Sequence, residues 1–283
     1  MANDFSMDAL PPAEMAMKAE AIGVKKATAP TSQLFNLAIL AGAYIALGAV
    51  FATTVAAGVS GVMPYGLAKL LIGLSFCLGL ILVVVGGAEL FTGNNLIIIA
   101  FAGRKISLRG LLRNWVIVYL GNFVGSIGIA VIMFFARQYT FADGLIGRTA
   151  LSIANGKLQF DFLQALSLGI MCNILVCLAV WLTFSARTTT DKIAALIFPI
   201  TAFVAAGFEH SVANMYFIPM GLLIKDFDPG FTSRIAALTN IDFGGMTWGA
   251  FFLSNLLPVT IGNMIGGAFL VGCIYWLIFL RRK

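Results

Sequence analysis

Six long apolar stretches alternate with short polar segments along this chain. They cover approximately residues 33–57, 67–100, 111–136, 160–184, 193–224 and 250–280. An α-helix needs about 18 or more apolar residues to cross roughly 30 Å of hydrocarbon, and each stretch reaches that length. The pattern therefore predicts an all-α membrane protein with six transmembrane helices.

A polar motif occurs twice, once in the second stretch and once in the fifth. Residues 87–94 read Gly-Ala-Glu-Leu-Phe-Thr-Gly-Asn, and residues 207–214 read Gly-Phe-Glu-His-Ser-Val-Ala-Asn. Glycine, glutamate and asparagine stand at matching places in the two copies. Stretches three and six likewise share Gly-Asn-x-x-Gly, at 121–125 and 262–266.

These repeats predict a duplicated fold. Because each half contains three stretches, the half at about 160–280 should be inverted relative to the half at about 31–136. The second and fifth stretches are overlong, and glycine and polar residues interrupt each of them, so both are expected to form broken helices. Inverted repeats place the substrate site near the membrane midplane, on such broken helices.

The composition agrees with a hydrocarbon environment, since 60% of the residues are hydrophobic and only 11% are charged. We expect two parts, an N-terminal segment at 1–30 and a six-helix transmembrane domain at 31–283. The first part lacks the basic start and apolar core of a signal peptide, so it should stay attached. Within it, residues 11–27 have the mixed pattern of an amphipathic helix at the membrane surface.

Lysine and arginine predict the orientation. If the amino terminus is cytoplasmic, twelve of the 18 basic residues lie inside and six lie outside. The positive-inside rule therefore places both termini in the cytoplasm. The net charge of +6 is explained by anionic lipid headgroups beside the cytoplasmic segments, so no nucleic-acid partner is expected.

His210 is the only histidine, and it lies beside Glu209 inside an apolar stretch. Ionisable residues at that depth are costly and usually mark a transport pathway, although a hydrogen-bonded structural histidine is the alternative. His210 and Thr92 both differ from their repeat partners, Leu90 and Val212. Specific chemistry is expected at such asymmetric positions, and Thr92 could hydrogen-bond His210 across the interface of the halves.

Glu89 and Glu209 occupy the same place in the two motifs, which favours a structural role for both. A carboxylate beside a helix break can accept hydrogen bonds from the freed backbone amides. Asparagines inside a membrane mostly bind neighbouring helices. Asn173 and Asn263 are the exceptions that we single out, because their helices could converge near the breaks.

No metal, cofactor or catalytic apparatus can be recognised in the sequence. The four cysteines form no CxxC pair, and one histidine with scattered carboxylates does not supply a zinc site. The phosphate-binding loop GxxxxGK[ST] and the nucleophile motif GxSxG are absent. We therefore expect no metal, no cofactor and no enzymatic activity.

Four segments closely resemble the formate/nitrite transporter family. They are Phe-Val-Ala-Ala-Gly-Phe-Glu-His-Ser-Val-Ala-Asn-Met at 203–215, Gly-Gly-Ala-Glu-Leu-Phe-Thr-Gly at 86–93, Pro-Val-Thr-Ile-Gly-Asn at 258–263, and Pro-Ala-Glu-Met-Ala at 12–16. The histidine segment is highly specific, and the resemblance covers nearly the whole chain. It implies a homopentamer of six-helix protomers in a bacterial inner membrane, each an aquaporin-like bundle with its own pore for small monovalent anions.

The resemblance also implies roles for individual residues. Apolar constrictions and a gate in the broken second helix would be formed by Phe76, Leu80, Leu90, Phe91 and Phe203. The substrate pathway would be lined by His210, Thr92, Asn173, Val176 and Asn263. Lys157 would attract anions at the periplasmic mouth.

These expectations lead to a functional hypothesis, which is bidirectional and pH-dependent passage of formate with His210 as the central protonatable residue. An imidazole, whose ordinary pKa is about 6.5, could stabilise the anion or protonate it to formic acid. Nitrite or hydrosulfide is the alternative substrate within the family. An aquaporin-like channel for neutral solutes is the alternative of another class.

Overall fold

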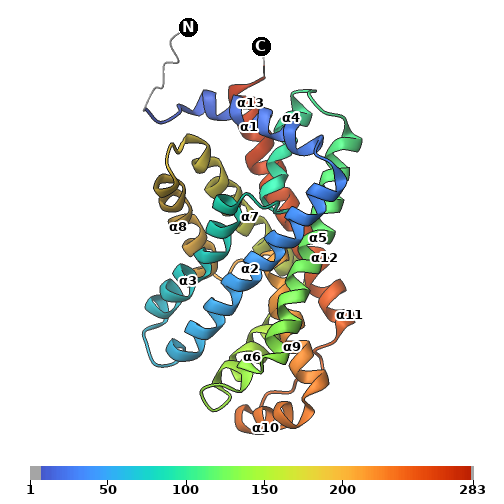
Figure 1. Ribbon diagram of the computed structural model, residues 1–283. Coiled ribbons are helices and arrows are strands. Elements are labelled where there is room, and N and C mark those ends of the chain that lie inside the picture. The colour runs from blue at the N-terminus through green and yellow to red at the C-terminus, as the bar shows by residue number, and fades with distance from the viewer. Residues whose placement is uncertain (1–7, 282–283) are drawn as a thin grey trace.

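The structure is a computed structural model that describes residues 8–281. All regular secondary structure in this part of the chain is helical (Figure 1). Residues 1–7 of the predicted N-terminal segment lie outside it, as do Arg282 and Lys283, which contributed to the charge count.

Within residues 8–281, five helices are long and apolar enough to cross a membrane. They are α2 (Thr31–Val59), α3 (Tyr65–Gly86), α5 (Leu108–Phe135), α7 (Phe162–Ser185) and a final helical run (Trp248–Phe279). The final run consists of α11 (Trp248–Ala250), the π-helical η3 (Phe251–Leu256), α12 (Leu257–Met264), the π-helical η4 (Ile265–Cys273) and α13 (Ile274–Phe279).

The predicted stretches at 67–100 and 193–224 are each divided. After α3 the chain is non-helical until η1 (Gly93–Ile97) and α4 (Ile98–Ala102). The other stretch forms α8 (Thr189–Ala205) and α9 (Ser211–Phe227), of 17 residues each. Each break contains a glycine, Gly87 or Gly207, with φ of +75°, which is a left-handed conformation that side chains disfavour. We call these the first break (87–92) and the second break (206–210).

Shorter helices lie at the two ends of the molecule. The expected surface helix is present as α1 (Pro12–Ala27), which lies at the same end as α13, whereas α6 (Leu145–Leu158) and α10 (Pro229–Thr239) lie toward the opposite end (Figure 1). A single turn, η2 (Gln138–Thr140), precedes α6. The sequence analysis did not predict α6, although its buried Ile146, Ala150 and Ala154 recur every four residues.

Glycine allows the long helices to approach closely. A Cβ added at Gly125 of α5 would overlap the Ile39 carbonyl of α2, and one at Gly266 would overlap the Ile170 carbonyl of α7. Small residues at a helix interface let two backbones pack directly, which is the usual way membrane helices associate. This packing fixes α2 against α5 and α7 against the final helix, so both breaks have rigid neighbours.

Candidate functional site

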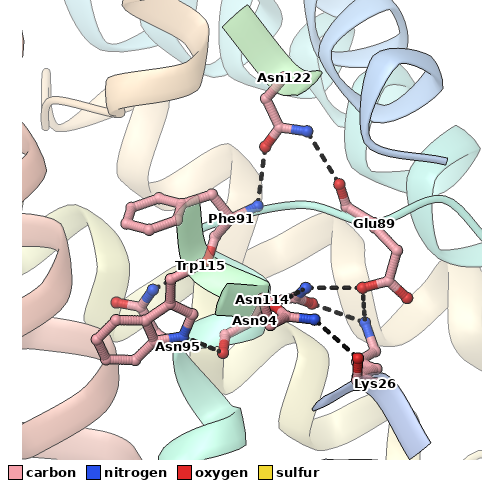
Figure 2. Close-up of polar contacts among 8 residues, drawn as sticks. All are labelled: Lys26, Glu89, Phe91, Asn94, Asn95, Asn114, Trp115 and Asn122. Atoms are coloured by element: carbon pink, nitrogen blue, oxygen red, sulfur yellow. Dashed lines mark hydrogen bonds and ion pairs between the residues drawn. The ribbon is translucent and has the colours of Figure 1, made fainter. Parts of the chain in front are cut away.

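A partly buried polar cluster surrounds Glu89 in the first break, and we call it the α1 cluster (Figure 2). Lys26 of α1 lies 3.1 Å from the Glu89 carboxylate and also donates to Asn94 Oδ1 at 2.7 Å. The Asn94 amide donates to Glu89 (2.7 Å) and to Asn114 (2.9 Å). Asn114 in turn donates to the Lys26 carbonyl at 3.0 Å, which closes the cluster.

A second cluster, the α6 cluster, repeats this arrangement around Glu209. Lys157 of α6 lies 2.6 Å from the Glu209 carboxylate. The Asn214 amide donates to Glu209 and to Asn255, each at 2.7 Å. Asn255 donates to the Lys157 carbonyl at 2.9 Å. Helices α1 and α6 therefore place a lysine in matching positions in the two halves, although Lys157, unlike Lys26, does not donate to the asparagine oxygen.

Asn122 holds the backbone of the first break. Its amide nitrogen donates to the carbonyls of Ala38 (2.8 Å) and Glu89 (2.9 Å), and its oxygen accepts from the Phe91 amide at 2.9 Å. These bonds satisfy polar groups that a helix would otherwise pair, as buried backbone requires.

Asn263 has the same contacts at the second break. It donates to the carbonyls of Gly169 (2.8 Å) and Glu209 (3.0 Å) and accepts from the Ser211 amide at 2.9 Å. The polar atoms of its side chain are thus all bonded to backbone groups, and substrate contact by Asn263 stays a prediction.

The sequence analysis overlooked Lys26, Asn114 and Asn255. The two asparagines could have been found, because each precedes the asparagine of a Gly-Asn-x-x-Gly motif by the same spacing.

The two ion pairs differ in burial. The side chains of Lys157 and Glu209 are 17% and 3% exposed, whereas those of Lys26 and Glu89 are 28% and 12% exposed. A buried pair depends on its partner, since removal of one charge leaves the other unpaired in a medium of low dielectric constant. Glu209 therefore compensates the positive charge of Lys157. The predicted attraction of anions depends on that same charge.

Thr92 and His210 meet between the two breaks, as the sequence analysis expected. His210 Nε2 lies 2.9 Å from Thr92 Oγ1, and His210 Nδ1 accepts from the Ala213 amide at 3.0 Å as the N-cap of α9. Since Nδ1 is an acceptor, neutral His210 carries its proton on Nε2 and donates it to Thr92. The hydroxyl hydrogen of Thr92 is then free to donate to another group.

One cavity reaches His210, and a second reaches Leu90 and Gly93 on the two sides of Thr92 in the chain. The α6 cavity, of about 400 Å³, is lined by Lys69, Lys157, Phe76, Phe203, Glu209 and His210 among others. The α1 cavity, of about 280 Å³, is lined by Lys18, Lys26, Lys192, Leu80, Glu89 and Leu90 among others. No described residue lines both cavities. Each has more lysines than carboxylates on its walls.

The charged rims of the cavities differ in detail. Burial, together with the charges of Arg187 and Lys192, lowers the pKa of Lys18 at the α1 cavity. At the α6 cavity, Lys69 lies 5.5 Å from the centre of the Tyr65 ring and forms no ion pair within residues 8–281. The sequence analysis did not single out Lys69, which is the unpaired lysine on the wall of the α6 cavity.

The predicted constriction residues are all buried but lie in different places. Phe76 and Phe203 pack edge to face at 5.6 Å beside the His210 ring, whereas Leu80 and Leu90 face the α1 cavity. Phe91 instead packs on Tyr119 and Trp115 of α5 and lines neither cavity. The pathway and gate roles of these side chains, and of the buried Asn173 and Val176, stay predictions.

An all-helical fold with long apolar helices, two breaks and a buried polar pair between two cavities defines a membrane transport protein. The family model described as formate/nitrite transporter matches residues 13–277. The chain belongs to this family.

Individual relatives match along almost the full length. The formate channel FocA of Escherichia coli is 45% identical over all of this chain and 99% of its own. FocA of Haemophilus influenzae is 44% identical, over 95% of this chain and 94% of its own. A solved pentameric formate channel with formate bound has a TM-score of 0.81 and 49% identity, over 89% of this chain and 98% of its own.

Proposed function

We propose that this protein is a formate channel that carries formate and other small monovalent anions in both directions. The observation that carries the proposal is the buried Thr92–His210 pair, which lies between two lysine-lined cavities in a chain so similar to formate channels. In this proposal passage depends on pH through His210.

Dehydration of the anion explains why such a site would be needed. A formate ion that enters an apolar constriction loses hydration worth far more than neutral contacts return. The Thr92 hydroxyl can donate to the anion, and a protonated His210 can neutralise it by transferring the Nε2 proton to a carboxylate oxygen. Formic acid then crosses the rings of Phe76 and Phe203, and the imidazole left behind is neutral with its proton on Nδ1, which must be exchanged for one on Nε2 before Ala213 can bind Nδ1 again.

Protonation of His210 has a structural consequence in this scheme. The second proton goes to Nδ1, where it would point at the Ala213 amide hydrogen. Charging the imidazole therefore requires loss of the N-cap bond of α9. The charge of His210 and the conformation of the second break are coupled in this way.

The same proposal includes the architecture and location. Helices α8 and α9 together form one interrupted span, which raises the five long helices to six, and the matched α1 and α6 clusters support inverted repeats in an aquaporin-like bundle. Five protomers assemble, each with its own pore, in the lipid of a bacterial inner membrane. Both termini are cytoplasmic, so the α1 cavity opens to the cytoplasm and the α6 cavity to the periplasm.

Two alternative functions, transport of nitrite or hydrosulfide and passage of neutral solutes, differ from formate transport in the substrate carried. Nitrite or hydrosulfide would use the same site, since both are small anions of weak acids. A channel for neutral solutes would not need lysines on the walls of both cavities. No enzymatic activity, metal or cofactor is part of the proposal.

The first test is transport by purified protein in proteoliposomes. We expect saturable uptake and release of labelled formate that changes with pH. Nitrite should compete weakly. A preference for nitrite would move the substrate within the family, and glycerol flux without formate flux would overturn the proposal.

We expect Lys69→Gln to lower formate flux about two- to fivefold at low salt, because an unpaired cation concentrates anions at the mouth of a pore. The effect should vanish near about 1 M salt, where charges are screened within about 3 Å. Lys225→Gln is the matched control, because Lys225 is paired with Asp226 and lies outside the α6 cavity. A reduction by Lys69→Gln that persists at high salt would contradict electrostatic attraction.

A further inference from the structure

The backbone carbonyl of Thr92 is bound by two side chains of α7. Asn173 Nδ2 and Cys177 Sγ both donate to this oxygen at 3.3 Å, and Asn173 Nδ2 makes a shorter bond, of 2.7 Å, to the Asn263 carbonyl. All three residues are fully buried. Asn173 and Cys177 lie one turn apart on one helix, so they hold the carbonyl from the same side. The first break is thereby attached to a helix of the other half of the chain.

Gly267 in the final helix leaves the space for both donors. A Cβ at this position would overlap the Asn173 amide and come within 2.7 Å of Cys177 Sγ. Real Cβ atoms do not approach other atoms so closely. Any larger residue at 267 would therefore push the two donors away from Thr92.

The second break is held differently. Val212, the repeat partner of Thr92, lies in the first turn of α9, and its carbonyl is 3.4 Å from the Ser126 hydroxyl of α5, which is nearer to the Gly42 carbonyl at 3.1 Å. Ser126 follows Asn122 by the same spacing at which Gly267 follows Asn263. A serine at position 267 would be the equivalent donor to the Thr92 carbonyl, but the chain has glycine there. The glycine and the two α7 donors are therefore particular to the break that contains Thr92.

We propose that Asn173, Cys177 and Gly267 form a clamp that sets the position of the Thr92 hydroxyl against His210. These are positioning residues, and the inference rests on the proposed formate channel for its transport consequences. The carbonyl and hydroxyl of Thr92 belong to one residue, so release of the carbonyl moves the oxygen that pairs with Nε2. Displacement of a reacting group by about 1 Å can cost about a hundredfold in rate.

The clamp can be tested without transport, because His210 is the only histidine. Protein labelled with ¹⁵N-histidine has one imidazole, and the Nε2 resonance reports its hydrogen bond to Thr92. We expect Cys177→Val, which removes the donor at similar volume, to shift this resonance. Cys177→Ser retains a donor and should keep the wild-type value. An unchanged Nε2 resonance in folded Cys177→Val would overturn the clamp.

The transport arm uses Cys172→Val as its matched control, since Cys172 lies on the same helix, is equally buried and donates no hydrogen bond to residues 8–281. Cys177→Val should reduce the preference for formate over nitrite at least about fivefold, because the misplaced hydroxyl no longer meets the anion. Cys177→Ser and Cys172→Val should stay within about twofold of wild type. Gly267→Ala should lower the preference for formate by as much as Cys177→Val does.

Absence of formate flux in the wild type would reject the proposed function alone, whereas equal selectivity in Cys177→Val and Cys172→Val would reject the clamp alone.

Discussion

Replacement of His210 by phenylalanine is expected to abolish pH-dependent formate flux. Phenylalanine keeps the ring against Phe203 but removes the proton on Nε2 and the hydrogen bond to Thr92. It also removes the N-cap of α9, which is worth about 1 kcal/mol. The measurement is labelled formate flux in proteoliposomes at several pH values, with the oligomeric state checked by gel filtration.

His210→Asn separates the two roles of the side chain. Asparagine is a good N-cap and can accept from the Ala213 amide, but its side chain does not gain or lose a proton. We expect this variant to fold like the wild type and to carry formate without the wild-type pH response. If His210→Phe and His210→Asn both retain the full flux and its pH dependence, His210 is not the protonatable residue of the pathway.

Replacement of Lys157 by methionine is expected to destabilise the protein by about 3–5 kcal/mol. The substitution leaves the Glu209 carboxylate, which is 3% exposed, with amide donors from Asn214 and Asn255 but no cation. The cost of an uncompensated buried charge therefore falls on the folded state. Denaturant unfolding of the detergent-solubilised protein measures the difference.

Lys26→Met is the control for burial, because Glu89 is more exposed and should lose less stability. The double variant Lys157→Met with Glu209→Gln should recover most of the loss, since no charge then remains unpaired. Equal losses for Lys157→Met and Lys26→Met would show that burial of the pair is not the cause. No recovery in the double variant would show that Lys157 stabilises the fold through its contact with the Phe217 ring, whose centre lies 5.4 Å from Nζ, rather than through its pair with Glu209.

The sequence predicted the long helices well because crossing hydrocarbon imposes a length and a composition that can be read locally. Helix α5 occupies 108–135, where 111–136 was expected, and α7 occupies 162–185, where 160–184 was expected. Both breaks occur where the repeated motifs place glycine, at Gly87 and Gly207. Helix α6 was missed, because a short surface helix has neither the length nor the apolar content of a span.

Contacts between distant residues were the harder part. The sequence indicated Glu89 and Glu209 through their duplication, but not that Lys26 and Lys157 would pair with them. Nothing local distinguishes a lysine that reaches a buried carboxylate from one that faces water. The same holds for Phe91, which follows Leu90 in the chain yet packs away from both cavities.

By itself, the sequence determined that this is a helical membrane protein with two interrupted helices and one histidine at depth. Apolar periodicity, glycine and the cost of burying charge act over a few residues, so they can be read directly. The tertiary structure alone decided which donors hold the Thr92 carbonyl, which lysines pair with a carboxylate, and where the two cavities end. Those outcomes depend on helix packing at distances of a few ångströms between residues far apart in the chain.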